Sequence, residues 1–239
     1  MADKPHLNQP EGRFRPSLHP NIQDRERELR SLTDAVRRLI EFNVTHEASA
    51  EQTAQTAREL HQLADRLETQ IPSQPPARYG PMPEPSEPHD HFLYDPVLGL
   101  YNPMALPVQM RWEPPRAIGE AKFTTPFEGP PGCVHGAVLA GVFDQVFNVA
   151  NLMTGSAGPT AELVLTYRRP TPLHRKVVFD AQVESIEGRK IRTLGHARYE
   201  GEVTVEARGL FILFEPGGID ELTRRMEGAL AIPGDETVE

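Results

Sequence analysis

The pattern of apolar and polar positions divides the chain into a helical first part and a strand-rich second part. In residues 24–45, leucine, valine and isoleucine recur at steps of three and four, which makes one apolar stripe along a helix. A second stripe of the same spacing predicts a helix that ends near residue 70, and Ser49 with Gln52 is typical of a capping box at its start. We therefore expect a helical hairpin or coiled coil within residues 23–71 that packs on another surface.

Proline marks the segment that follows this helical region. Residues 72–104 include the run IPSQPPARYGPMPEPSEPH and predict a linker or extended arm, because proline fixes φ and removes a backbone donor. Residues 1–22 are polar and contain proline, a composition typical of a disordered terminus. The globular domain is expected at residues 105–216, followed by a C-terminal tail at 217–239.

The period of the pattern changes near residue 108. Two short β-like runs, QMRWEP and AIGEAKFTT, precede one apolar helix at residues 135–153. Four runs rich in β-branched and aromatic residues follow the helix: AELVLTYRRP, KVVFDAQVESI, KIRTLGHARYE and EVTVEARGLFILF. Short separators between the last three predict an antiparallel meander. Because the helix is apolar almost all round, we expect an α+β fold in which an antiparallel sheet wraps it.

Composition excludes several classes of protein and of site. The length of 239 residues allows one or two domains with a sizeable core. The formal net charge of −9, without a basic patch on an element that enters a groove, argues against a nucleic-acid partner. The single cysteine excludes an internal disulfide and a cysteine-based zinc site. Without a secretory signal or an apolar run long enough to span a membrane, a soluble, cytoplasmic protein is expected.

One ionisable residue interrupts the apolar helix. Residues 129–151 read GPPGCVHGAVLAGVFDQVFNVAN, and Asp144 lies in their middle. A carboxylate in an apolar setting is poorly solvated, which raises its basicity and suits it to act as a base. The alternative interpretation is a structural acid that is satisfied by a hydrogen bond from Thr, Asn or Arg.

The order of these elements around one wrapped helix resembles the hotdog fold. The run PPGCVHGAVLAGVFD is similar to the G-x-x-H-G-G…D signature of the phenylacetate-type (PaaI-like) acyl-CoA thioesterases. TAELVLTYRRPTPL resembles the third strand of that family, and EGRK resembles its turn between strands four and five. The likeness is strongest to the THEM4-like branch and covers about residues 108–214. Two positions depart from the pattern, since Ala137 replaces the second glycine and Gly129 stands where some relatives have asparagine.

This resemblance implies an acyl-CoA thioesterase with a role in lipid metabolism. The catalytic carboxylate of the family maps onto Asp144, as nucleophile or as general base, with no metal and with coenzyme A present only as part of the substrate. The backbone amide of Gly136 would polarise the thioester carbonyl, because N–H groups at a helix start are free. Thr160 would orient the attacking water or the carboxylate, as in the THEM4-like branch. His135 and Ala137 would shape the substrate site.

Three further residues are candidates for contacts with the substrate. Asn148 follows Asp144 by four residues and shares its helix face, beside the expected substrate channel or in an ordinary polar network. Arg168 and Arg169 are candidates for the phosphates of coenzyme A, although clustered charges in a loop are commonly just solvated.

The spacing of the two catalytic groups predicts an oligomer. Gly136 and Asp144 are eight residues apart on one helix, so about 12 Å apart along its axis. A thioester carbonyl needs its oxygen donor and its nucleophile each within about 3–3.5 Å. We therefore expect an active site across a dimer interface, in a homodimer or in a homotetramer formed as a dimer of dimers.

Two other functions remain open. Ala137 and the helical N-terminal region are compatible with a non-enzymatic hotdog protein that binds acyl-CoA without turnover. An acyl-thioester hydratase or dehydratase is less favoured, because such enzymes carry a histidine soon after the aspartate. Here no histidine follows Asp144 before His174.

Overall fold

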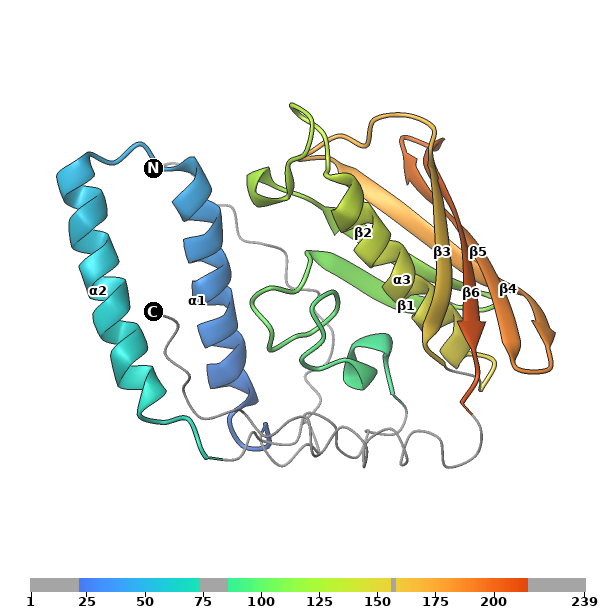
Figure 1. Cartoon of the computed structure of the whole chain (residues 1–239), viewed down its shortest axis with the longest axis horizontal. Helices are drawn as coiled ribbons and strands as arrows, with labels where there is room; N and C mark the ends of the chain where they lie inside the picture. Colours follow the sequence, from blue (N-terminus) through green and yellow to red (C-terminus); the bar gives the residue numbers. More distant parts are fainter. Residues whose placement is uncertain (1–21, 74–85, 156–157, 215–239) are drawn as a thin grey trace, which may run out of the picture. The chain divides into compact units, whose positions relative to one another are not determined.

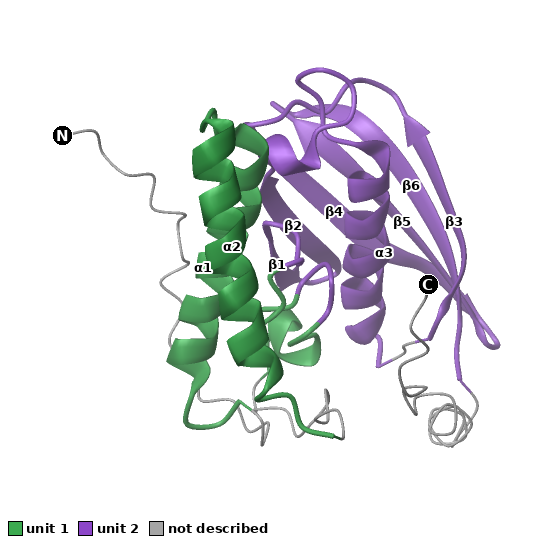
Figure 2. Ribbon diagram, turned by 60° about the vertical axis from the view of Figure 1, so that its left-hand side comes forward, with its two compact units in different colours: residues 1–94, 99–103 green, residues 95–98, 104–239 purple. Residues whose placement is uncertain are grey.

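The computed structural model describes residues 22–73, 86–155 and 158–214, which form two compact units (Figure 2). The first unit takes Met1–Tyr94 with Gly99–Pro103, and the second takes Asp95–Leu98 with Met104–Glu239. The predicted C-terminal tail, the polar residues 1–21 and residues 74–85 of the predicted linker lie outside the described residues.

The first unit contains the predicted pair of helices, which is confirmed. Helix α1 spans Glu26–Thr45, α2 spans Ala50–Glu68, and a short 3-10 helix, η1, spans Pro88–His91. The capping box at the start of α2 is present as expected. The Ser49 hydroxyl accepts from the Gln52 N–H at 3.3 Å, and the Gln52 side chain accepts from the Ser49 N–H at 3.0 Å.

Arginine side chains connect α1 to the last residues of its unit. Arg37 donates to the carbonyl oxygens of Gly99 and Asn102, at 3.1 and 2.9 Å. The Arg30 guanidinium lies 6.0 Å from the centre of the Tyr101 ring, within the range of a cation–π contact. In this unit the arginines of α1 therefore make tertiary contacts, whereas Leu32 and Leu39 of its apolar stripe are 49% and 40% exposed.

The second unit is a six-stranded antiparallel sheet with one long helix, as predicted (Figure 1). Its elements are β1 (Val108–Glu113), β2 (Arg116–Lys122), the short 3-10 helix η2 (Thr125–Phe127), α3 (Gly136–Leu152), β3 (Thr160–Tyr167), β4 (Lys176–Glu187), β5 (Lys190–Tyr199) and β6 (Glu202–Ile212). The strand order is β1-β2-β4-β5-β6-β3, so the expected meander of β4, β5 and β6 is confirmed. Strand β3 crosses to the far edge, where it pairs with β6.

Helix α3 lies against one face of the sheet and contributes aromatic residues to the core (Figures 1 and 2). Phe147 is fully buried, and its ring centre lies 6.2 Å from that of Phe211 on β6. Two strand glycines make room for this ring. A Cβ atom would lie 2.8 Å from the Phe147 ring at Gly195 and 2.7 Å from it at Gly209. These glycines therefore let the helix approach the sheet closely.

The residues just before β1 pack on another side of α3. A Cβ atom at Gly141 would lie 3.8 Å from Val97 and 3.9 Å from Leu106. Leu98 and Ala105 of the same segment are buried. The sheet covers one side of α3 and this segment covers another, so part of the helix surface stays accessible. Asp144 is half-buried and lies on this part.

Candidate active site

Strand β3 brings a hydroxyl to the acid of the central helix. Thr160, the first residue of β3, donates from its Oγ1 to Asp144 Oδ1 at 2.6 Å. A short hydrogen bond to a carboxylate fixes the rotation of the carboxyl group. The structure thus brings together two of the three residues that the sequence predicts as catalytic.

The second carboxylate oxygen of Asp144 remains available. Among the described residues, no group donates a hydrogen bond to Asp144 Oδ2. Asn148 does not fill this position, because its side-chain amide donates to the backbone oxygen of Asp144 at 3.2 Å. Asp144 is half-buried, and its second oxygen has the capacity to accept a hydrogen bond from a water or a substrate.

The start of α3 presents one backbone N–H without a partner. His135 is the N-cap residue, and its Nδ1 accepts from the Ala137 N–H at 3.0 Å. The backbone oxygen of His135 accepts from Val138 and Leu139, at 3.0 and 3.3 Å. Within the described part of the chain, the Gly136 N–H donates to no acceptor. It lies at the positive end of the helix dipole, where a developing negative charge is favoured.

His135 and Ala137 therefore have defined structural roles at this helix start. His135 caps the helix through its ring, and Ala137 donates the capped amide. The loop before them is packed tightly, since a Cβ atom at Gly129 would lie 2.8 Å from His135 Cα. Gly129 thus allows this loop to lie against the cap.

A tyrosine outside the predicted site residues also reaches this helix start. Tyr167, the last residue of β3, donates from its hydroxyl to the carbonyl oxygen of Gly136 at 2.9 Å. Its only signal in the sequence is its position at the end of a predicted strand. Its role depends on which helix end this strand crosses, and the pattern of residues does not contain that information.

The two arginines predicted to bind coenzyme A are not brought to Asp144. Arg168 donates to Glu206 at 2.7 Å, and this hydrogen bond holds the pKa of the Glu206 carboxyl below its ordinary value. Arg169 forms an ion pair of 2.6 Å with Glu202. Both acids lie on β6, so each charge is already compensated at the surface.

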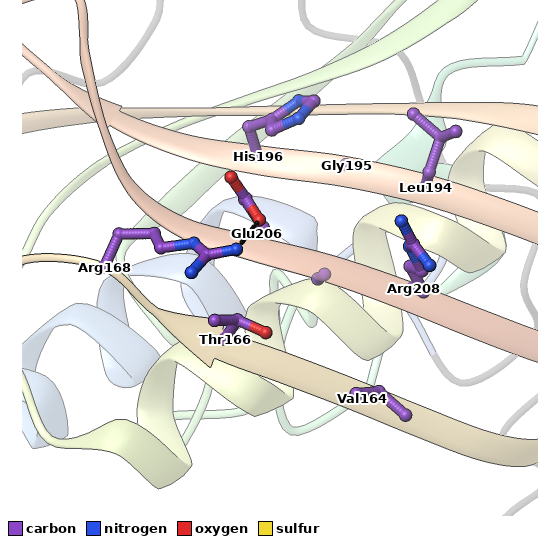
Figure 3. Close-up of a pocket in the computed structure, with 9 residues that line it drawn as sticks. Val164, Thr166, Arg168, Leu194, Gly195, His196, Glu206 and Arg208 are labelled. Carbon is purple, nitrogen blue, oxygen red and sulfur yellow. Dashed lines mark hydrogen bonds and ion pairs between the residues drawn. The ribbon is translucent and has the colours of Figure 1, made fainter.

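Arg168 lines a hollow on the sheet face opposite α3 (Figure 3). Successive side chains of a strand alternate between faces, and Gly195 and Gly209 face the helix. Their neighbours His196 and Arg208 therefore face away from it. The labelled residues of this hollow are Val164, Thr166, Arg168, Leu194, Gly195, His196, Glu206 and Arg208. The hollow is thus separate from the Asp144 site.

The described residues contain neither a cluster suited to a metal ion nor a helix suited to span a membrane. In residues 22–73, 86–155 and 158–214, no group of three or more His, Cys, Asp or Glu side chains is arranged to hold a metal ion. No helix in these ranges is long and apolar enough to cross a membrane.

Comparisons with known proteins match the part of the chain that contains α3 and β3. The family model described as the thioesterase superfamily matches residues 131–208, which include α3 and β3. Bovine "Acyl-coenzyme A thioesterase THEM4" is 37% identical over 91 residues, which are 37% of this chain and 37% of that protein. Human "Acyl-coenzyme A thioesterase THEM5" is 30% identical over 87 residues, 36% of this chain and 35% of that protein. The matches thus span little more than a third of these relatives.

A solved structure matches over a longer range. The crystal structure of a thioesterase superfamily protein is 36% identical to this chain. The match covers 77% of this chain and 94% of that one, with a TM-score of 0.68.

Proposed function

This chain belongs to the thioesterase superfamily and has its hotdog fold, and from that premise we propose that it hydrolyses an acyl-CoA thioester to a free acid and coenzyme A. The curated relatives named as acyl-coenzyme A thioesterases support this substrate class. The observation that carries the proposal is the 2.6 Å bond from Thr160 to Asp144, which leaves the other carboxylate oxygen available.

Asp144 acts as the base or as the nucleophile in this proposal. As a base, it takes a proton from a water molecule whose oxygen attacks the thioester carbon. The carbon–sulfur bond then breaks, and the proton passes from Asp144 to the departing thiolate. As a nucleophile, Asp144 attacks the carbon directly, and the carbon–sulfur bond breaks to give an anhydride and the coenzyme A thiolate. Water then hydrolyses the anhydride, which regenerates the carboxylate, releases the acid and supplies the proton that the thiolate takes up. In both routes Thr160 holds the carboxylate in one orientation.

The Gly136 N–H supplies the donor for the carbonyl oxygen. The tetrahedral intermediate carries a negative charge on that oxygen, and a preorganised backbone donor at a helix start stabilises it.

The two groups come from different protomers. They are eight residues apart along α3, about 12 Å, which is too far for one carbonyl to contact both. Among the described strands, β3 is at one edge of the sheet, and an edge strand is suited to pair with a second copy. Thr160, at its first residue, contacts Asp144, and Tyr167, at its last, contacts Gly136.

Antiparallel pairing of two β3 edges brings these ends together. The Thr160 end of one strand then lies beside the Tyr167 end of the other, so each Asp144 approaches the partner's Gly136. This arrangement supports a homodimer with two equivalent composite sites, which a further pairing would convert into a dimer of dimers.

The test is the release of free thiol from short, medium, long and aryl acyl-CoAs by the full chain. We expect turnover with part of this panel and a fall of about 100-fold or more in kcat for Asp144→Asn, because general-base catalysis contributes roughly this much. Asp65→Asn on the exposed surface of α2 is the control and should match the unaltered protein.

Two outcomes would replace this function. Retained binding of acyl-CoA with no thiol release from any member of the panel would indicate the non-enzymatic binding protein. Hydration of an unsaturated acyl-CoA without thiol release would indicate the hydratase.

A further inference from the structure

We propose that Tyr167 is a positioning residue, which holds the first turn of α3 so that the Gly136 N–H is presented to the thioester oxygen. The inference rests on the proposed function and adds to it a residue outside the sequence signature. Tyr167 touches neither the carboxylate nor, in this assignment, the reacting atoms. It acts through the peptide that follows Gly136.

The contact is specific, although the side chain is accessible. In the single chain, Tyr167 is 53% exposed, so burial does not force its hydroxyl to bond within the chain. It nevertheless donates to the Gly136 carbonyl oxygen at 2.9 Å, across 31 positions of the chain. A tertiary hydrogen bond at this place joins the end of β3 to the first residue of α3.

The first turn of a helix needs such support when it begins with glycine. Helix ends fray, and glycine loses more backbone freedom on folding than any other residue. The peptide between Gly136 and Ala137 is held at both of its polar groups. Tyr167 binds its oxygen, and the His135 ring binds its N–H at 3.0 Å.

The preceding peptide, between His135 and Gly136, is held on one side only. Its oxygen accepts from Val138 and Leu139, and its N–H is the unpaired Gly136 donor. Fixing the peptide on the far side of Gly136 limits rotation about the Gly136 backbone. It therefore limits how far the unpaired N–H can move from the direction in which an oxyanion would be bound.

Tyr167 also occupies the space that a side chain at position 136 would need. A Cβ atom at Gly136 would lie 3.0 Å from the Tyr167 hydroxyl oxygen and 3.3 Å from the ring carbon that bears it. The two positions are thus coupled by sterics as well as by the hydrogen bond. Strand β3 consequently orients both groups of the proposed site, with Thr160 on Asp144 and Tyr167 on Gly136.

The first experiment compares Tyr167→Phe with the unaltered full chain. We expect kcat to fall about 10-fold while KM changes little, because a displaced oxyanion donor weakens mainly the transition state. Tyr199→Phe is the matched control, since the Tyr199 hydroxyl bonds to Glu200 at the surface. It should leave both constants unchanged.

Hydrogen exchange gives a readout that does not depend on activity. Backbone amides of the first turn of α3 should exchange faster in Tyr167→Phe than in Tyr199→Phe, with no change in β4 and β5. An equal increase throughout the second unit would mean a general loss of stability, and would overturn a positioning role.

A double-mutant cycle tests the steric coupling. Gly136→Ala places a methyl group against the Tyr167 hydroxyl, so its loss of kcat should be smaller in the Tyr167→Phe background. Equal losses in both backgrounds would contradict the coupling.

If Asp144→Asn abolishes turnover but Tyr167→Phe alters neither kcat nor first-turn exchange, the proposed function stands and the role of Tyr167 is wrong. If no acyl-CoA is hydrolysed at all, the proposed function fails, and first-turn exchange alone decides whether Tyr167 holds the helix start.

Discussion

The hydroxyl of Thr160 lies 2.6 Å from the carboxylate of Asp144, and 16 positions of the chain separate the two residues. Asp144 lies in the third turn of α3, whereas Thr160 begins β3 at the edge of the sheet. Their contact therefore exists only because the chain after α3 turns back along the helix. This pairing gives an ionisable residue in an apolar helix both a partner and an orientation.

Loss of the Thr160 hydroxyl should reduce turnover without unfolding the protein. Thr160→Val keeps the β-branched shape but frees the carboxylate to rotate, so we expect kcat to fall about 10- to 100-fold. Steady-state kinetics with the best acyl-CoA would measure it. Thr160→Ser, which keeps the hydroxyl, should retain most of the activity, and equal losses in both variants would show that the hydroxyl is irrelevant.

Removal of the Gly136 N–H should be more damaging than addition of a side chain. Proline suits the first position of a helix, and His135 before it has φ −62° and ψ 137°, which a following proline tolerates. Gly136→Pro therefore deletes the donor while the helix can still form. We expect a loss of about 100- to 1,000-fold in kcat. Gly136→Ala keeps the donor and should lose less; the reverse order would exclude this amide as the oxyanion donor.

Oligomers that mix Asp144→Asn protomers with Gly136→Pro protomers should recover activity that neither variant has alone. Each heterodimer of Asp144→Asn with Gly136→Pro has one site with both groups intact and one with neither. Random mixing gives half heterodimers, so about a quarter of the original activity is expected. Co-expression of the two variants with different tags allows this measurement. No recovery from isolated heterodimers would mean that each site lies within one protomer.

Because little space is left beside the Phe147 ring, replacement of the strand glycines by alanine should destabilise the fold. A methyl group at Gly209 would lie 2.7 Å from the Phe147 ring, so Gly209→Ala should lower the free energy of unfolding by about 1–3 kcal/mol. Gly119 is the control on β2, because its nearest atoms would lie 3.4 Å away, an ordinary contact. Urea unfolding of both alanine variants would compare them. A loss at Gly119 as large as that at Gly209 would contradict the proposed role of the ring.

A charge cluster on β1, β2 and β4 should make stability depend on pH. The hydrogen bond from Lys176, and then that from Arg111, lowers the pKa of the Glu120 carboxyl below its ordinary value of 4.5. Because the folded pKa is the lower one, this contribution is present above the ordinary pKa and is lost as pH falls through the folded value. Glu120→Gln should therefore lower Tm at pH 7 slightly, and the difference should vanish in acid. If the difference in Tm between the two proteins persists at low pH, its cause is packing rather than the charge of Glu120.

The sequence by itself determined the features that depend on neighbouring residues. Steps of three and four predicted α1 and α2, because a helix repeats every 3.6 residues, and a long run that is apolar almost all round predicted α3. Ser49 with Gln52 predicted the start of α2, since a capping box needs only those two positions. Short separators predicted the β4, β5 and β6 meander, and the single acid in an apolar helix pointed to Asp144.

Only the tertiary structure decided which distant groups meet. Side-chain periodicity assigns a residue to a face of its own element but not to a neighbour, because strand pairing is set by the whole sheet. The placement of β3 beside β6 brought Arg168 to Glu206, a pairing that the sequence did not predict. The same placement carried Thr160 to Asp144 and Tyr167 to Gly136, so the position of one edge strand determines the geometry of the site.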